Sequence, residues 1–133
     1  MHYDMRTQAM ADESWTDMSQ RRLNAIEPGY VVPIHRHQKT SETVVVLRGR
    51  VVEVYYDGFG NVIESILIAP VGDCHIADAS RNGVAVISAL NIPVGQWHTI
   101  RALEIGAVIL EMYDGAYEPI QECDVLRQLN LDA

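Results

Sequence analysis

Hydrophobic and polar residues alternate in short runs through the middle of the chain, from residue 30 to residue 113. These runs are rich in β-branched residues and are separated by Gly, Asp, Asn and Pro, which is typical of the strands of a β-sandwich or barrel. Between two runs, the sequence DGFGN at 57–61 supplies the glycines of a hairpin loop. The pattern predicts an all-β domain with a longer loop over 71–83 and strands at 30–36, 42–48, 50–56, 62–68, 84–91, 97–102 and 107–113.

The two ends of the chain lack this alternation. Residues 8–26 mix apolar and polar side chains without a period of two, and residues 119–131 place apolar side chains three residues apart after Pro119. Both segments are predicted to contain short helices, packed on the outer face of the barrel or on a second subunit. We therefore divide the chain into an N-terminal extension (1–20), a barrel (21–118) and a helical tail (119–133).

Length and charge narrow the classes of function. The 133 residues are the size of one domain, and 10 basic against 18 acidic residues give a net charge of −8. An acidic surface opposes phosphate contacts, so nucleic acid is not an expected partner. Without an apolar stretch of membrane-spanning length or an apolar signal region, no membrane partner is expected either. Cys74 and Cys123 lack a paired spacing, which favours reduced thiols and a cytoplasmic protein.

The candidate chemistry begins with two histidines. His35 and His37 are two residues apart, so on an extended strand both imidazoles project from one face and can reach one ion. Glu42 follows at an odd separation, so the polar residues 38–41 must turn or bulge to bring its carboxylate to that ion. His98 follows a Pro-Val-Gly turn at the start of another predicted strand, on which it points inward. These four side chains are candidate metal ligands from separate segments.

Two motifs resemble those of the cupin superfamily. Gly29, His35-x-His37, Glu42 and Gly49 occupy every fixed position of the first cupin motif, and Pro93-x-Gly95-x-x-His98 matches the centre of the second. The stretches VVVLRGRV, DGFGNV and IPVGQWHTIRAL resemble the small bacterial cupin-fold metalloproteins of the WbuC type, over about residues 21–119. The resemblance implies a cupin jelly-roll β-barrel that binds one divalent transition metal per chain, zinc, nickel, iron or manganese, through His35, His37, Glu42 and His98.

The chain departs from these patterns at positions outside the expected ligands. Ile87 stands where the second cupin motif has Gly, and Ala102 where it has Asn. The WbuC-type motif E-x-K-x-G-P-Y has a Tyr in place of its Lys and an Ala in place of its Pro in residues 111–117 of this chain. A substrate role for that Lys therefore does not carry over.

Three further residues are candidates for the substrate pocket. Glu111 either faces the pocket, as a general base or a partner of a metal ligand, or faces the solvent or pairs with an arginine. Tyr117 is the tyrosine that the motif resemblance favours as a catalyst, with a packing or rim position as the alternative. Arg48 shares the parity of Glu42, so on an unbulged strand it points along the pocket and can bind a substrate carboxylate or phosphate. Strand twist would instead take Arg48 to a surface ion pair.

The expected ligand set limits the function without choosing a reaction. Three neutral imidazoles and one carboxylate leave a divalent ion with a local charge near +1, which favours an oxygen anion and suits an isomerase, an oxygenase or a hydrolase equally. The WbuC resemblance adds an association with polysaccharide biosynthesis. We therefore expect a metal-dependent enzyme acting on a small, anionic or sugar-like molecule, such as a sugar or sugar-nucleotide derivative. The alternative is a non-catalytic module that binds or senses such a ligand. Edge strands in a barrel of this size predict a homodimer.

Overall fold

The structure, a computed structural model, describes residues 2–4, 18–73 and 87–126. Regular structure in these residues is nearly all β-strand, as the sequence predicts, with a 3-10 turn η1 (Glu122–Asp124) near the C-terminal end. No helix in the described residues is long and apolar enough to cross a membrane. The strands are β1 (His2–Asp4), β2 (Gln20–Ile26), β3 (Ile34–His35), β4 (Glu42–Tyr56), β5 (Val62–Ile68), β6 (Ala89–Ile92), β7 (Trp97–Tyr113) and β8 (Val125–Leu126).

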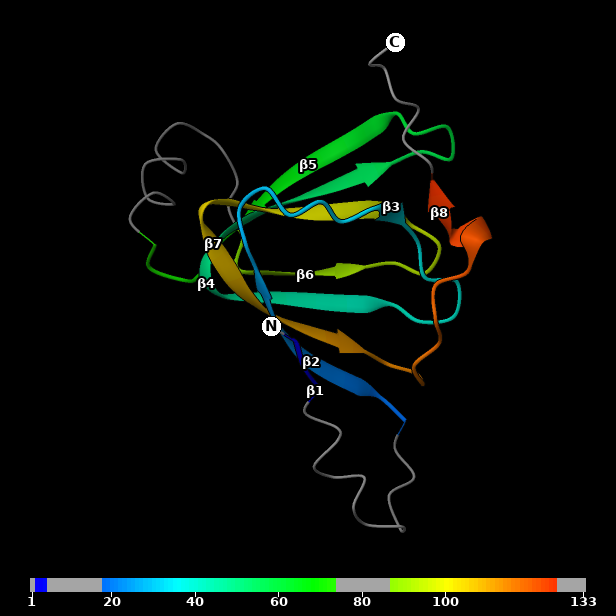
Figure 1. Cartoon of the computed structure of the whole chain (residues 1–133), viewed down its shortest axis with the longest axis horizontal. Helices are drawn as coiled ribbons and strands as arrows, with labels where there is room; N and C mark the ends of the chain where they lie inside the picture. Colours follow the sequence, from blue (N-terminus) through cyan, green and yellow to red (C-terminus); the bar gives the residue numbers. More distant parts are fainter. Residues whose placement is uncertain (1, 5–17, 74–86, 127–133) are drawn as a thin grey trace.

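Two long strands, β4 and β7, organise the sheet (Figure 1). They pair with each other in antiparallel register along most of their length. β2 and β3 also pair with β7, whereas β5 and β6 pair with β4. β1 extends the sheet beyond β2, and β8 extends it beyond β3. The eight strands therefore form one curled antiparallel sheet.

Both long strands bend near their middle, at Gly49 and Gly106. The φ angles of these glycines are +75° and +73°, and register shifts flank Gly49 in β4. A Cβ atom on Gly49 would collide with the carbonyl oxygen of Gly106, so the two backbones meet where only glycine fits. The bends lie at the left end of the sheet in Figure 1, and η1 and β8 lie at the opposite end. The strands predicted at 42–48 and 50–56, and at 97–102 and 107–113, are the halves of these two bent strands.

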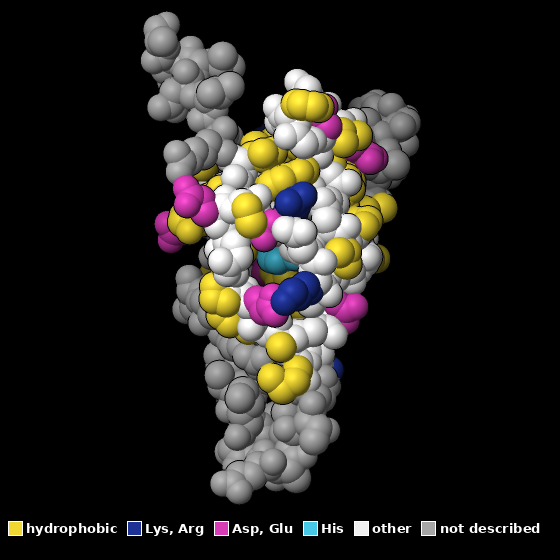
Figure 2. Space-filling view, turned by 90° about the vertical axis from the view of Figure 1, so that its right-hand side faces the viewer, with side chains coloured by type: hydrophobic (Ala, Val, Ile, Leu, Met, Phe, Trp, Pro, Cys, Tyr) yellow, Lys and Arg dark blue, Asp and Glu magenta, His cyan; other side chains and the backbone are white. Residues whose placement is uncertain are grey.

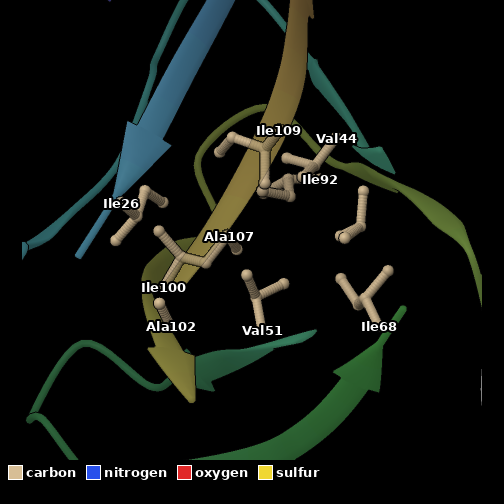
Figure 3. Close-up of a cluster of buried hydrophobic side chains, with 10 residues drawn as sticks. Ile26, Val44, Val51, Ile68, Ile92, Ile100, Ala102, Ala107 and Ile109 are labelled. Carbon is tan, nitrogen blue, oxygen red and sulfur yellow. The ribbon is translucent and has the colours of Figure 1, made fainter. Parts of the chain in front are cut away.

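The hydrophobic core fills the inside of the curl (Figure 3). Alternate residues of β4 and β7 point inward, and Val51 and Ile109 are fully buried there. Burial of each Val or Ile side chain stabilises the fold by about 1.5–3 kcal/mol. The buried cluster consists of Ile26, Val44, Val46, Val51, Ile68, Ile92, Ile100, Ala102, Ala107 and Ile109.

The structure confirms some of the shorter predicted elements and shortens or shifts others. The hairpin loop at 57–61 is confirmed, because the Asp57 carboxylate accepts the backbone N–H groups of Phe59 and Asn61, both at 2.9 Å. The strand predicted at 62–68 is β5. The strand predicted at 30–36 is reduced to the two residues of β3, and the one predicted at 84–91 is β6 at 89–92. Residues 74–86, which include most of the predicted loop at 71–83, lie outside the described residues.

Both ends of the chain differ from the predicted helices. Residues 20–26, inside the segment predicted as helical at 8–26, form strand β2 and pair with residues 107–113 of β7. That partner is distant in the sequence, so local composition did not reveal the strand. Within 119–126 the tail contains the 3-10 turn η1 and strand β8 instead of an α-helix. The rest of both predicted helices, at 8–17 and 127–131, lies outside the described residues.

Candidate metal centre

Four candidate metal ligands meet at the end of the sheet away from the glycine bends. One ligand atom from each of His35, His37, Glu42 and His98 lies within 4.8 Å of the other three. The Oε2 atom of Glu42 is 3.2 Å from Nε2 of His98 and 3.3 Å from Nε2 of His37. The structure therefore brings together all four side chains that the sequence predicts as ligands.

Strand register and one turn produce this cluster. His35 in β3 is the direct antiparallel partner of His98 in β7, and their ring centroids are 4.3 Å apart. Residues 36–41 leave the strand conformation, which confirms the predicted turn, and β4 then begins at Glu42. The carbonyl of His37 accepts the backbone N–H of Gly95 at 2.7 Å, which ties this turn to the one before β7.

Backbone carbonyls orient two of the imidazoles. Nδ1 of His35 is 2.8 Å from the carbonyl oxygen of Pro33, and Nδ1 of His98 is 2.8 Å from that of Gln96. Because a carbonyl oxygen only accepts, each Nδ1 carries the proton and each Nε2 keeps its lone pair. This is the arrangement by which proteins orient histidines that bind a metal through Nε2.

The electrostatics of the cluster favour the protonation states that bind a metal. Burial, with a contribution from nearby His98, lowers the pKa of His35 to about 4. Burial opposes a charge on Glu42, but the close contacts of its carboxylate with His37 and His98 outweigh burial and lower the pKa of Glu42 to about 2. At neutral pH His35 is therefore neutral and Glu42 is an anion, as coordination requires.

The donor set fits a divalent transition metal. Donor atoms placed about 2.0–2.2 Å from one ion lie roughly 3–4 Å from one another. The distances of 3.2 and 3.3 Å between the Glu42 oxygen and its two histidine nitrogens fall in this range. Imidazole nitrogen suits zinc, nickel and iron, and a carboxylate oxygen also suits manganese, so these donors do not select one metal.

The cluster lies at the floor of a pocket of about 870 Å³. His35 and His37 line it, and Figure 2 shows a histidine at the bottom of a hollow flanked by basic and acidic side chains. β2, the turn at 36–40 and most of the segment at 115–124 form its walls. Ion pairs hold that segment in place: Arg36 with Asp124 at 3.0 Å and Lys39 with Glu118 at 2.9 Å. The site is therefore open to a ligand of small size.

Glu111 lies close to the pocket but behind Tyr113. The Tyr113 hydroxyl donates to Oε2 of Glu111 at 3.0 Å, and its ring centroid is 5.1 Å from that of His37. Tyr113 lines the pocket, whereas Glu111 does not. Burial and the nearby charge of Glu42 raise the pKa of Glu111 to about 7. The structure therefore places Glu111 beside the pocket, linked to its wall by the hydrogen bond from Tyr113.

The structure places Tyr117 at the pocket and Arg48 away from it. Tyr117 lines the pocket near its mouth with 54% of its surface exposed. Arg48 is exposed and is not among the residues that line the pocket. The register shift between Val46 and Arg48 leaves Leu47 as an extra residue, so the alternation of inward and outward side chains is interrupted before Arg48. A pocket position for Arg48 required this alternation to continue unbroken. The structure thus does not bring Arg48 to the site.

Two residues with potential roles were missed by the sequence analysis. Arg22 lines the pocket from β2, on the inward side with Gln20. The sequence QRRLNAI at 20–26 has no clear alternation of apolar and polar residues, so the local pattern did not reveal that Arg22 faces the pocket. Glu53 is 1% exposed, and neither of its carboxylate oxygens has a hydrogen-bond partner. Burial, together with the charges of Glu42 and Glu111, raises the pKa of Glu53 well above its usual range.

Comparisons with known proteins support the fold. The profile of one family, described as a domain of unknown function (DUF6016), matches residues 5–68. The protein BH2720 from Bacillus halodurans has a similar structure, with a TM-score of 0.59 and 18% identity over 78% of this chain and 67% of that one. A tryptophan-to-tyrosine variant of Bacillus subtilis oxalate decarboxylase has a TM-score of 0.62 and 18% identity over 94% of this chain. No curated protein sequence matches the chain.

These likenesses identify the fold as that of a cupin, as the motifs implied. A further oxalate decarboxylase structure from Bacillus subtilis, described through its Mn(II) centres, has a TM-score of 0.59 and 19% identity over 89% of this chain. The chain spans only about a quarter of the oxalate decarboxylase chains, 25% of one and 27% of the other.

Proposed function

We propose that this chain is a metal-dependent enzyme of the cupin fold that acts on a small, oxygen-rich molecule of anionic or sugar-like character. The observation that carries the proposal is the convergence of three histidines and one glutamate at the floor of an open pocket. A pocket of about 870 Å³ suits a small molecule, because ligand pockets in proteins are typically about 300–1,000 Å³.

The ligand set favours an open, catalytic type of centre. Four protein donors leave coordination positions vacant on a metal that accepts six ligands, and one carboxylate leaves a divalent ion with a net positive charge. When bound, such an ion supplies Lewis-acid chemistry to a substrate oxygen. The cysteine ligands typical of closed structural zinc sites are absent from the cluster that the described residues form.

Tyr113 and Glu111 are the residues that we propose for proton transfer. The Tyr113 hydroxyl lies at the pocket wall and donates a hydrogen bond to the Glu111 carboxylate at 3.0 Å. With a pKa of about 7, Glu111 is present in both protonated and charged forms at neutral pH. A general acid or base works best when its pKa is near the working pH. Burial and the charges of Glu42 and Glu111 raise the pKa of Tyr113 well above its usual range, so we assign the acid–base role to Glu111, with the Tyr113 hydroxyl relaying the proton between Glu111 and the substrate.

The resemblance to WbuC-type cupins supports a narrower form of the proposal. It favours a sugar or sugar-nucleotide derivative as substrate, a role in polysaccharide biosynthesis in the cytoplasm, and isomerase or oxygenase chemistry. Tyr117, at the pocket mouth, would then contact the substrate where it enters. The metal would be zinc, nickel, iron or manganese, the last being the metal of the Mn(II) centres described for oxalate decarboxylase.

A spectroscopic screen followed by turnover assays tests the proposal. Cobalt(II)-loaded protein is titrated with sugar phosphates, hydroxy acids and keto acids, and ligands that shift its visible spectrum are then incubated with protein carrying each of the four metals. We expect at least one ligand to shift the spectrum and be converted. Tyr113→Phe should keep the metal and lower turnover by about 10²–10⁴-fold. Tyr30→Phe, which alters a tyrosine that is 65% exposed, should leave turnover unchanged.

Two outcomes would contradict this account. If no ligand shifts the cobalt spectrum, the centre is closed and the enzyme proposal fails. If ligands bind but none is converted with any of the four metals, the chain is the alternative predicted from the sequence, a non-catalytic module that binds or senses a small ligand.

A further inference from the structure

Arg22 is a pocket-lining cation that is held rigidly in place. Its Nη2 donates to Oε1 of Gln20, and the Gln20 side chain, 4% exposed, donates in turn to the carbonyl oxygen of Gly115 at 3.1 Å. The Cζ atom of Arg22 lies 4.7 Å from the ring centroid of Tyr117 and 5.6 Å from that of Tyr113. An amide and two aromatic rings therefore fix the guanidinium before any ligand arrives.

Among the residues whose side chains the structure describes, no carboxylate forms an ion pair with Arg22. Three basic side chains line the pocket, and two of them are neutralised: Arg36 by Asp124 at 3.0 Å and Lys39 by Glu118 at 2.9 Å. The Nε atom of Arg22 is buried and has no hydrogen-bond partner. Glu111 is the register partner of Arg22 in β7 and attracts it electrostatically, but the Glu111 carboxylate forms no ion pair with the guanidinium and accepts the Tyr113 hydroxyl. A partly buried guanidinium without a close ion-pair partner favours an incoming anion.

A single aromatic ring separates this cation from the metal ligands. The Tyr113 ring is in contact distance of both, with its centroid 5.1 Å from the His37 ring centroid and 5.6 Å from Cζ of Arg22. A ligand that follows the face or edge of this ring can reach the metal centre with one end and Arg22 with the other. Such a ligand needs a chain of only a few atoms between its two polar groups.

We infer that Arg22, supported by Gln20 and Tyr117, forms an anion subsite of the pocket. Its ligand is a small two-headed molecule with an oxygen donor for the metal at one end and a carboxylate or phosphate for the guanidinium at the other. This inference rests on the proposed function, because the first end is bound by the metal centre. A guanidinium presents its donors as a planar fork, so either anionic group can accept two hydrogen bonds from it.

Ligand binding to metal-loaded variants tests the subsite. Isothermal titration of zinc-loaded full-length protein measures the Kd of acetate, malonate, succinate and glycerol 3-phosphate, with metal content determined in each sample. Arg22→Gln should keep the metal and raise the Kd of the two-headed probe that binds the wild-type protein most tightly by about 10–100-fold. Acetate, which can occupy only the metal end, should change by less than about twofold. Arg22→Lys keeps the positive charge but loses the planar fork of donors, so its Kd for that two-headed probe should lie between those of the wild-type protein and Arg22→Gln.

Controls separate the possible failures. Arg101→Gln removes an exposed arginine of β7 that does not line the pocket, and it should leave every Kd unchanged. If the wild-type protein holds metal and binds a two-headed ligand equally well with and without Arg22, the subsite is wrong while the metal centre stands. If the wild-type protein holds no metal or binds none of the probes, the proposed function itself fails. A loss for glycerol 3-phosphate alone identifies phosphate as the anion, and a loss for the dicarboxylates alone identifies carboxylate.

Discussion

His35 and His98 face each other as direct partners of an antiparallel strand pair, with ring centroids 4.3 Å apart. Both use Nδ1 to contact a backbone carbonyl two residues earlier in the chain, at 2.8 Å in each case. The metal centre is therefore built into the register of β3 and β7. Any slip of this register by one residue would turn one of the two imidazoles to the other face of the sheet.

The close approach of Gly49 to Gly106 yields a stability prediction. Gly49→Ala places a methyl group against the Gly106 carbonyl oxygen at a φ of +75°, so it should lower the free energy of unfolding by more than about 2 kcal/mol. Gly60→Ala is the matched control, because its φ is +86° but nothing lies within 4 Å of the added Cβ. That change should cost only about 1–2 kcal/mol. Urea unfolding measures both values, and equal costs would contradict the proposed contact.

Glu53 yields a prediction about pH. Its folded-state pKa is raised by burial first and by the charges of Glu42 and Glu111 second, so the folded chain binds this proton more tightly than the unfolded chain. The protonated Glu53 carboxyl therefore stabilises the folded chain at low pH. This stabilisation is lost as the pH rises from the pKa of Glu53 in the unfolded chain towards its higher pKa in the folded chain. In metal-free protein, unfolding by urea between pH 4 and pH 9 should show this loss.

Substitution of Glu53 tests the same point directly. Glu53→Leu removes a buried, unpartnered carboxyl, so it should raise the free energy of unfolding at pH 8 by about 1–3 kcal/mol and flatten the pH profile. Glu64→Leu, at an exposed position of β5, should change stability by less than about 0.5 kcal/mol. An unchanged pH profile in Glu53→Leu would show that Glu53 does not titrate as the structure requires.

We propose that the protein is a homodimer and that the two chains meet at strand β5, at the edge of the sheet. Among the described residues β5 pairs with β4 and, at its end, through a single bridge from Ile68 to Ile87, and Val62 and Ile63 at its other end are 61% and 62% exposed. An exposed apolar edge strand is commonly covered by another chain. Sedimentation velocity should show a dimer that Ile63→Lys weakens. A strictly monomeric wild-type protein at high concentration would remove this proposal.

The sequence predicted the metal centre better than its surroundings. The ligands follow from local spacing, since the turn at 36–41 is required by the odd separation between His37 and Glu42. The pocket walls depend on non-local pairing: β2 forms only because residues 107–113 lie beside it, so Arg22 was assigned to a helix. For Arg48 the sequence left a pocket and a surface position open, and the exposed position follows from a bulge at Leu47, for which alternation alone contains no signal.

The metal content of the purified protein tests the central claim most directly. Inductively coupled plasma mass spectrometry should find about one divalent transition-metal ion per chain in the wild-type protein. The combined change His37→Ala and His98→Ala should abolish it, while circular dichroism shows that the β-sheet is retained. His75→Ala, which changes a histidine outside both motifs, should keep the metal. Retention of stoichiometric metal by the double variant would contradict the assignment of this site.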